Sequence, residues 1–432
     1  MRSGGGRPAF DTERPETRAL VLHPDIHGAA RPREPEAGLA EAEALARALP
    51  GLTVVGAEVV ALRQVQPGTL FGAGKLDELA ARIAAEEVGL VLIDGPVTPV
   101  QQRNIEEAWK TKVLDRTGLI LEIFADRAAT REGVLQVELA ALSYQRTRLV
   151  RAWTHLERQR GGLGFVGGPG ETQIEADRRA IDEAITRLRR QLDRVTKTRA
   201  LHRAARAKVP FPVVALVGYT NAGKSTLFNR MTGAEVTAKD MLFATLDPTM
   251  RAIELQTGPT VILSDTVGFI SDLPTQLVAA FRATLEEVLE ADLILHVRDI
   301  SHPETEAQAA DVAQILSDLG VGQDTPILEL WNKVDRLEAN ARATVEEIAA
   351  RRPEVLTLSA WSGEGLMPVV DAVTTSLEGV RTEEDIALMF SEGRRRAWLH
   401  ERRVVLNEAQ TETGWHLHVR WSKRQKSAFA SL

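Results

Sequence analysis

The chain contains no cysteine among its 432 residues, which excludes a disulfide framework, a cysteine-based zinc site and a cysteine nucleophile. No apolar run approaches the roughly eighteen residues of a membrane span, and the start, MRSGGGRPAF, lacks the apolar block of a signal peptide. We therefore expect a cytoplasmic protein that enters no membrane. We also expect it to act as a monomer.

The chain also has no overall excess of basic residues. The chain has 53 Lys and Arg against 60 Asp and Glu, which gives a net charge of −7. This balance argues against a protein that coats nucleic acid with its whole surface, although it permits a local basic element. With 44% hydrophobic and 26% charged residues the composition is that of a globular protein, and the length suggests about three domains.

The first third of the chain predicts a small α/β domain. Residues 1–18 are rich in Gly, Pro, Arg and Glu and predict a flexible tail. Over residues 19–132, short apolar runs alternate with helical patterns. The helices are expected over residues 36–48, 76–87 and 99–111, each after a strand (ALVLH, LTVVGAEVV, GLVLIDG), and VLDRTGLILEIFADRA adds a strand and the start of a helix.

Residues 133–209 predict two long helices that fold back on each other. Apolar residues recur at steps of three and four in two series, as in a helical seam. A loop, GGLGFVGGPG at residues 161–170, separates the series and should form the tip of an antiparallel hairpin. The two series are Leu135, Leu139, Leu142, Leu149, Trp153 and Leu156, then Ile181, Ile185, Leu188, Leu192 and Val195.

This hairpin is strongly basic. Residues 146–208 hold sixteen Lys or Arg against seven Asp or Glu, a net charge of +9 that leaves −16 for the rest of the chain. Two interpretations stay open: the arginines form solvated helix faces, or they bind RNA or another phosphate-bearing partner. For the second, Arg158 and Arg160 beside the glycine loop are our candidates for RNA phosphate contacts.

Two further units complete an α/β multidomain protein. Residues 210–379 alternate strands and helices and predict a mostly parallel sheet. Residues 380–432 predict a small α+β unit of βαββ order, with a helix near 394–401 and a turn at TETG. The sequence assigns no chemical role to this last unit.

The central unit opens with a phosphate-binding motif. The segment GYTNAGKS fits GxxxxGK[ST] and lies between an apolar strand and a helical run, the context that this P-loop motif requires. Backbone N–H groups would surround the phosphates, Lys224 would reach the β and γ phosphates, and Ser225 would bind Mg²⁺. The residues expected to contact nucleotide are Gly218, Tyr219, Thr220, Asn221, Ala222, Gly223, Lys224, Ser225 and Thr226.

Three later motifs each follow an apolar strand, where a parallel sheet places its ligands. In DTVG, Asp265 would hold the metal through water and the Gly268 amide would sense the γ-phosphate. In NKVD, the carboxylate of Asp335 would accept from guanine N1–H and its exocyclic amine, a donor pair that adenine lacks. In SAW, Ala360 would donate to the guanine carbonyl. The predicted set is Asp265, Thr266, Val267, Gly268, Asn332, Lys333, Val334, Asp335, Ser359, Ala360 and Trp361.

A switch threonine is expected between the P-loop and DTVG. The segment FATLDPT offers Thr245 and Thr249, and we favour Thr245, which would close on Mg²⁺ and the γ-phosphate in the triphosphate state. With Lys224 and Gly268 it forms the predicted catalytic set. The neighbouring residues assigned to the nucleotide site are Phe243, Ala244, Leu246 and Asp247.

Together these motifs resemble the Obg and HflX branch of translation-factor-related GTPases. Upstream, LFGAGKLDEL, RTGLILEIFADRAATREGVLQVELAALSYQRTRL and GGPGETQIE are similar to the N-terminal and linker signature of the HflX family. The resemblance covers most of residues 20–380. It implies a cytoplasmic GTPase that binds GTP, GDP and the large ribosomal subunit, can split stalled ribosomes, and has ribosomal RNA as its polyanionic partner.

Two positions qualify the mechanism. Phe269 stands where a Ras-like protein has a water-orienting Gln, and its ring can neither accept nor donate a hydrogen bond. We expect slow intrinsic hydrolysis, and a partner or another group that completes the site. Asn221 lies where some related GTPases recruit K⁺, although an ordinary P-loop amide contact explains this residue equally well.

A second nucleotide site is the remaining question. The string GAGK at residues 72–75 lacks the spacer and trailing Ser or Thr of a P-loop, and we interpret it as a turn that opens a helix at Lys75. Three functions stay open: a GTPase switch on the ribosome, an RNA-remodelling ATPase that uses an N-terminal nucleotide site, and a GTPase scaffold for a protein partner.

Overall fold

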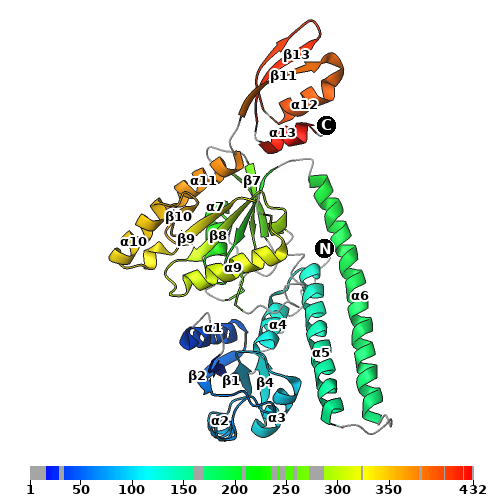
Figure 1. Ribbon diagram of the computed structural model, residues 1–432, viewed down its shortest axis with the longest axis vertical. Helices are drawn as coiled ribbons and strands as arrows, with labels where there is room; N and C mark the ends of the chain where they lie inside the picture. Colours follow the sequence, from blue (N-terminus) through cyan, green and yellow to red (C-terminus); the bar gives the residue numbers. More distant parts are fainter. Residues whose placement is uncertain are drawn as a thin grey trace, which may run out of the picture.

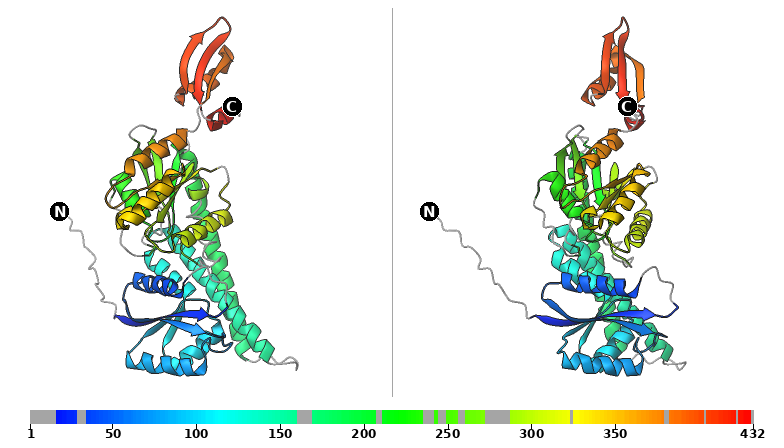
Figure 2. Two further views of the ribbon diagram at one scale, coloured as in Figure 1. Left: turned by 60° about the vertical axis from the view of Figure 1, so that its left-hand side comes forward. Right: turned by 90° about the vertical axis from the view of Figure 1, so that its left-hand side faces the viewer.

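In the computed structural model, three sheets and a helical hairpin lie along one long axis (Figures 1 and 2). The N-terminal sheet lies at one end, the six-stranded sheet in the middle and the small C-terminal sheet at the other end. The structure describes residues 16–28, 34–159, 169–206, 211–234, 242–243, 249–255, 260–271, 287–322, 325–378, 382–402, 404–421 and 423–430.

The N-terminal unit is a parallel sheet with the strand order β2-β1-β3-β4. Side chains alternate along β1, so Ala19 and Val21 pack toward α1 and α4, while Leu20 and Leu22 pack toward α2 and α3. The elements are β1 (Thr17–Ile26), α1 (Pro35–Ala48), β2 (Leu52–Leu62), α2 (Ala73–Ala85), β3 (Leu90–Ile93), α3 (Pro99–Trp109), β4 (Lys112–Asp115) and α4 (Arg116–Arg127).

The predicted tail over residues 1–18 is two residues too long. Hydrogen bonding to the sheet starts at Thr17, whose N–H donates to Gly51 O at 2.8 Å, so Thr17 and Arg18 belong to β1. Residues 1–15 lie outside the described part of the chain.

The hairpin consists of α5 (Arg131–Gln159) and α6 (Pro169–Arg206), which run antiparallel and side by side, as the heptad pattern predicts (Figures 1 and 2). Buried seam residues include Leu135 on α5 and Leu188 on α6. Residues 160–168 lie outside the described part. The loop expected over 161–170 ends earlier than predicted, because Pro169 and Gly170 already form the first turn of α6, where a proline lacks only an N–H that would be unpaired anyway.

The central unit is a six-stranded sheet with the order β10-β9-β8-β5-β7-β6, in which only the edge strand β6 runs antiparallel to its neighbour. This confirms the mostly parallel sheet. Helix α9 packs on one face through Val312, and α7 and α11 pack on the other through Leu227 and Val369. The elements are β5 (Val213–Val217), α7 (Lys224–Thr232), β6 (Thr249–Glu254), β7 (Thr260–Asp265), β8 (Leu293–Asp299), α9 (Thr305–Leu319), β9 (Ile327–Asn332), η1 (Val334–Arg336), α10 (Ala339–Ala350), β10 (Val355–Thr357) and α11 (Leu366–Glu378).

The C-terminal unit is an antiparallel sheet of order β11-β13-β12 covered by two helices. The predicted βαββ order is present, and a helix that we did not predict, α13, follows it and buries Phe429 beside Trp421. The elements are β11 (Thr382–Met389), η2 (Phe390–Glu392), α12 (Gly393–Glu401), β12 (Val405–Gln410), β13 (Gly414–Trp421) and α13 (Lys423–Ala430).

Among the described helices, none combines the length and the apolar character that crossing a bilayer requires.

Candidate nucleotide site

The P-loop, residues 218–225, links the end of β5 to the start of α7. Gly218 has φ +150° and lies so close to β8 that a Cβ would collide with the carbonyl oxygen of Val297. Gly223 has φ +99° and caps α7, and Asn221 takes a left-handed φ of +60°. These backbone angles curl the chain around the N-terminus of α7, whose unpaired N–H groups and dipole favour an anion.

Lys224 is the first residue of α7 and folds back over the P-loop. Its Nζ donates to the carbonyl oxygens of Gly218 at 3.0 Å and Tyr219 at 2.8 Å. Burial lowers the pKa of Lys224 to about 8, helped by the nearby charge of Lys333 and opposed by Asp265. The ammonium is therefore desolvated and close to neutrality, a condition that a polyphosphate would relieve.

The oxygen atoms suited to a divalent cation lie beside this lysine. Ser225 Oγ donates to Asp265 Oδ2 at 2.6 Å, and Asp265 ends β7 fully buried. Hydroxyl and carboxylate oxygens are the ligands that Mg²⁺ prefers. By contrast, the hydroxyl of Thr266 donates to Leu216 O at 2.6 Å and so ties β7 to β5.

Gly268 packs directly on the P-loop. A Cβ at this position would lie 2.9 Å from Thr220 Cα and 3.1 Å from Lys224 Nζ, so only glycine fits. The next residue, Phe269, is buried and pairs with the P-loop through its backbone: Thr220 N donates to Phe269 O at 2.7 Å, and Phe269 N donates to Gly218 O at 3.1 Å. An apolar, inward-facing ring thus occupies the position where Ras-like proteins carry Gln.

Asn332, the first residue of NKVD, links the P-loop to the SAW loop, residues 359–361. Its Nδ2 donates to Ala222 O at 2.8 Å, and its Oδ1 accepts from the N–H of Ala360 at 2.9 Å. We expected that Ala360 N–H to donate to guanine, but the protein itself already pairs it, because a buried N–H needs a partner. A guanine carbonyl would have to share or replace that contact.

The remaining base-site residues lie around Asn332. Lys333 takes φ +67° and its Nζ lies 2.7 Å from Asp299 Oδ2. Val334 is buried and Asp335 is exposed on η1, with its carboxylate accessible to a ligand. Ser359 is fully buried, and its hydroxyl accepts from Ser362 N at 3.1 Å rather than facing a base. Trp361 is 80% exposed.

The predicted switch segment is only partly described. Ala244, Thr245, Leu246 and Asp247 lie outside the described residues, so the choice of Thr245 stays a prediction. Thr249 opens β6 opposite Asp265. Phe243, which we assigned to the nucleotide site, buries its ring edge-on against Phe124 of α4, with centroids 4.6 Å apart. The ring thus serves packing between the units, and the assignment of Phe243 to the nucleotide site stays a prediction.

Tyr219 holds the contact that sequence reasoning missed. Its hydroxyl faces away from the phosphate cradle, donates to Glu41 on α1 and accepts from Ser271 N at 2.7 Å. Glu41 and Tyr219 are 178 residues apart, one on helix α1 of the N-terminal unit and the other in the P-loop of the central unit. No local pattern in the sequence points from one to the other.

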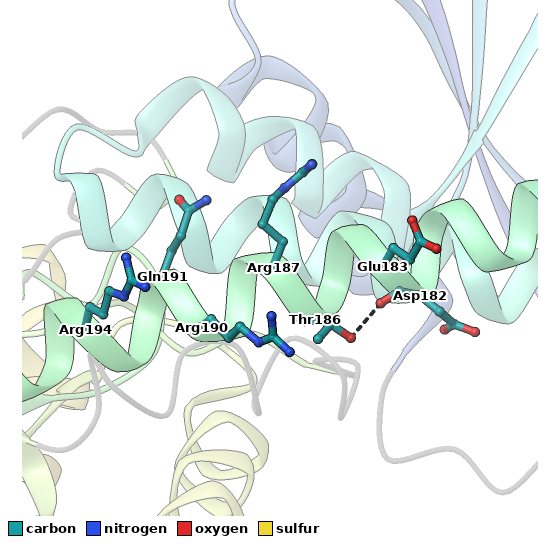
Figure 3. Close-up of a pocket in the computed structure, with 7 residues that line it drawn as sticks. All are labelled: Asp182, Glu183, Thr186, Arg187, Arg190, Gln191 and Arg194. Atoms are coloured by element: carbon teal, nitrogen blue, oxygen red, sulfur yellow. Dashed lines mark hydrogen bonds between the residues drawn. The ribbon is translucent and has the colours of Figure 1, made fainter.

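A hollow with three arginines lies on the surface of the hairpin. Figure 3 shows Arg187, Arg190 and Arg194 along α6, with two acids, Asp182 and Glu183, at one end. The hollow measures about 630 Å³ and is open to solvent. Arg160 lies outside the described residues, as does the side chain of Arg158, although its backbone is part of α5.

Comparison with known proteins finds similarity over most of the chain. Three family profiles match in order: GTP-binding GTPase N-terminal (residues 36–125), GTP-binding GTPase Middle Region (127–206) and 50S ribosome-binding GTPase (213–333). Among curated relatives, the GTPase HflX of Magnetococcus marinus is 51% identical over 84% of this chain and 83% of its own length. The GTPase HflX of Escherichia coli is 44% identical over 81% of each.

The solved structures that match are less similar in sequence than these relatives. A GTP-binding protein from the archaeon Sulfolobus solfataricus in complex with GDP is 23% identical, with a TM-score of 0.45 over 84% of this chain and 99% of that one.

Proposed function

The chain belongs to the HflX family of GTPases and is a GTP hydrolase, and from that membership we propose that it is a GTP-driven switch that binds the large ribosomal subunit through ribosomal RNA and dissociates or rescues stalled ribosomes. The observation that carries the proposal is the pairing, in one chain, of a P-loop unit that matches a 50S ribosome-binding GTPase with a strongly basic hairpin. It acts in the cytoplasm, as a monomer.

In this proposal the P-loop, residues 218–225, holds the phosphates together with Thr226. Lys224 gives up its two carbonyl partners to reach the β and γ phosphates, and the amide of Gly268 contacts the γ-phosphate. Thr245 closes on the same phosphate. Asp335 selects guanine, because its exposed carboxylate accepts two hydrogen bonds that adenine cannot donate.

Mg²⁺ fits the oxygen pair formed by Ser225 and Asp265. Ser225 would bind the ion directly and Asp265 through water, with Thr245 as the third protein contact. The ion would neutralise charge that develops on the phosphates. Asn221, exposed and left-handed at the mouth of the P-loop, is the residue that would recruit K⁺; equal turnover in potassium and sodium salts of one ionic strength would exclude that role.

Intrinsic hydrolysis should be slow in this proposal. The buried ring of Phe269 cannot orient water, so either the ribosome completes or orders the site, or another group positions the water. The first case places hydrolysis after ribosome engagement, as a release step.

The RNA-binding surface is the hairpin. Arg187, Arg190 and Arg194 are separated by three and four residues, so they follow one face of α6 (Figure 3). Guanidinium groups bind phosphate through paired N–H donors. We add this stripe to Arg158 and Arg160, which flank the glycine loop.

The alternative of an N-terminal ATPase is not favoured. Lys75 in the first turn of α2 lies 2.5 Å from Glu58 and 2.8 Å from Glu78, so two carboxylates surround the only lysine of GAGK. A phosphate there would meet like charge. A GTPase that scaffolds a protein partner without RNA would bind that partner with weak salt dependence, whereas phosphate contacts give a steep one.

Cosedimentation with purified ribosomal subunits tests the proposal. Binding of the full chain is measured in the presence of GTP, of GDP and of a non-hydrolysable GTP analogue. We expect the analogue to give the strongest binding to the large subunit. Replacing both Arg187 and Arg190 with Glu should reduce that binding at least tenfold, because two contacts become repulsive. Arg351→Glu, an exposed position on the central unit, is the control. Equal binding by all three proteins would refute the hairpin as the RNA surface.

A further inference from the structure

One helix of the N-terminal unit contacts the segments that flank both expected switches. Arg116 at the start of α4 reaches Ser271, three residues after Gly268. Phe124, two turns later, packs on Phe243, two residues before Thr245. Figure 1 shows α4 between the N-terminal sheet and the central unit. The two contacts involve different residues: the first consists of hydrogen bonds and the second is aromatic.

The polar contact is a cluster of buried and partly buried groups from both units, which we call the interdomain cluster: His23, Glu41, Asp94, Arg116, Tyr219 and Ser271. Arg116 Nη2 donates to Ser271 O at 3.1 Å and to Ser271 Oγ at 2.8 Å, and it also donates to Glu41. Ser271 Oγ donates to Glu41 Oε1 at 2.6 Å. The other oxygen of Glu41 accepts from the Tyr219 hydroxyl.

Asp94 joins Arg116 and His23 in this cluster. Arg116 Nη1 lies 2.6 Å from Asp94 Oδ1, and His23 Nδ1 lies 2.7 Å from Asp94 Oδ2. Burial acts to raise the pKa of Glu41, but the charge of Arg116 and the bonds from Ser271 and Tyr219 outweigh it, so that pKa lies below its ordinary value. Breaking one contact would leave a buried charge without its partner, which is costly.

The position of the cluster in the fold is that of a ligand site. In the order β2-β1-β3-β4 the connections reverse direction between β1 and β3, and open α/β sheets bind ligands outside the strand ends at such a point. His23 lies near the end of β1 and Asp94 directly follows β3. Arg116 extends from this edge to Ser271. Ser271 of the central unit thus occupies the place at the strand ends where such a sheet would bind a ligand.

The cluster fixes the two segments between which a γ-phosphate would lie. A Cβ on Gly268 would already lie 2.9 Å from Thr220 Cα and 3.1 Å from Lys224 Nζ, so a phosphate placed between Lys224 Nζ and the Gly268 amide needs more room than the structure leaves there. Ser271, however, is held at its N–H, carbonyl oxygen and hydroxyl. Moving Gly268 therefore strains the contacts of Ser271 with Glu41 and Arg116.

We propose that the interdomain cluster couples the γ-phosphate to the docking of the N-terminal unit: Glu41 and Arg116 are positioning residues that hold Tyr219 and Ser271, and triphosphate binding opens the contact. The inference rests on the proposed GTP switch and names its regulation. Coupling is reciprocal, so weakening the cluster must favour triphosphate over diphosphate.

The test measures nucleotide affinity of the full chain without ribosomes. Calorimetry gives the Kd of GDP and of a non-hydrolysable GTP analogue for the wild type and for Glu41→Gln. We expect the ratio of the GDP Kd to the analogue Kd to rise about tenfold in the variant, because the analogue no longer has to open the cluster. Glu43→Gln on the same helix, whose partner Arg47 lies on α1 itself, should leave the ratio unchanged.

A second variant and a second readout guard against a merely structural effect. Ser271→Ala removes one hydroxyl and should shift the ratio in the same direction by a smaller factor. Hydrogen exchange of residues 119–124 should rise when the analogue replaces GDP in the wild type, and it should be high with both nucleotides in Glu41→Gln. An unchanged ratio in both cluster variants would overturn the coupling while leaving the GTP switch intact. Failure of the wild type to bind either guanine nucleotide would overturn both.

Discussion

Asp115 and Arg116 are consecutive residues whose side chains hold different parts of the molecule. Asp115 accepts from Tyr144 Oη at 2.6 Å and from Arg148 Nη1 at 3.2 Å, both on α5 of the hairpin. Arg116 binds Ser271 of the central unit. A single turn at the start of α4 therefore connects the basic hairpin with the nucleotide unit, and a displacement of α4 must reach both.

Replacing Asp115 with Ala should destabilise the N-terminal unit by about 3 kcal/mol. Asp115 caps α4 by accepting from Gly118 N at 2.8 Å, a role worth about 1 kcal/mol. Its loss also removes the acceptor of the Tyr144 hydroxyl and the carboxylate partner of Arg148, which keeps Gln102 as an acceptor, for about 2 kcal/mol more. Scanning calorimetry measures the change, and Glu122→Ala on the exposed face of α4 is the control, with an effect below about 0.5 kcal/mol. Equal melting of both variants would contradict this anchoring role.

Replacing Asp335 with Asn should move selectivity from guanine to xanthine nucleotides. In the proposed base site the carboxylate would accept two charge-assisted hydrogen bonds from guanine, so GTP affinity should fall at least about a hundredfold. An amide can instead donate to the second carbonyl of xanthine, so XTP affinity should rise. Competition binding measures both, with Glu338→Gln, an exposed acid on the same surface, as the control. Retained preference for GTP in Asp335→Asn would sink the assignment of the base site.

The sequence predicts those parts of the site that depend on local geometry. Gly218 and Gly223 are required where the P-loop turns around α7, and such turns leave a readable spacing. Alternating apolar residues likewise predict β1 and its two faces.

What the sequence cannot predict depends on contacts between distant segments. Tyr219 fits a variable position of the motif, and only the packed structure brings its hydroxyl to Glu41. Phe243 fits a family string near the nucleotide, yet its ring is drawn into the apolar interface with Phe124. Helix α13 is short and polar at its start, so its one buried aromatic, Phe429, gives no periodic signal.

Nucleotide binding should take up protons near pH 8. Burial lowers the pKa of Lys224 to about 8, so about half of the free protein carries a neutral amine at that pH. The phosphates favour the ammonium form, so binding should draw about half a proton per nucleotide at pH 8 and almost none at pH 6.5. Calorimetry in two buffers of different ionisation enthalpy measures the uptake. Identical binding heats in both buffers at pH 8 would contradict a desolvated lysine.

His296 should make the central unit sensitive to mild acid. Burial, together with Arg298 and Lys224, lowers its pKa to about 4, while Glu329 acts in the opposite direction. Below pH 6.5 His296 is protonated in the unfolded chain but stays neutral in the folded chain. The free energy of unfolding therefore decreases as the pH is lowered, by about 2 kcal/mol between pH 6.5 and pH 5. His296→Gln, which cannot titrate, should lose correspondingly less stability between pH 7 and pH 5 in urea unfolding. The surface histidines contribute equally to both proteins, so a parallel decline in wild type and variant would show that His296 takes up its proton in the folded state.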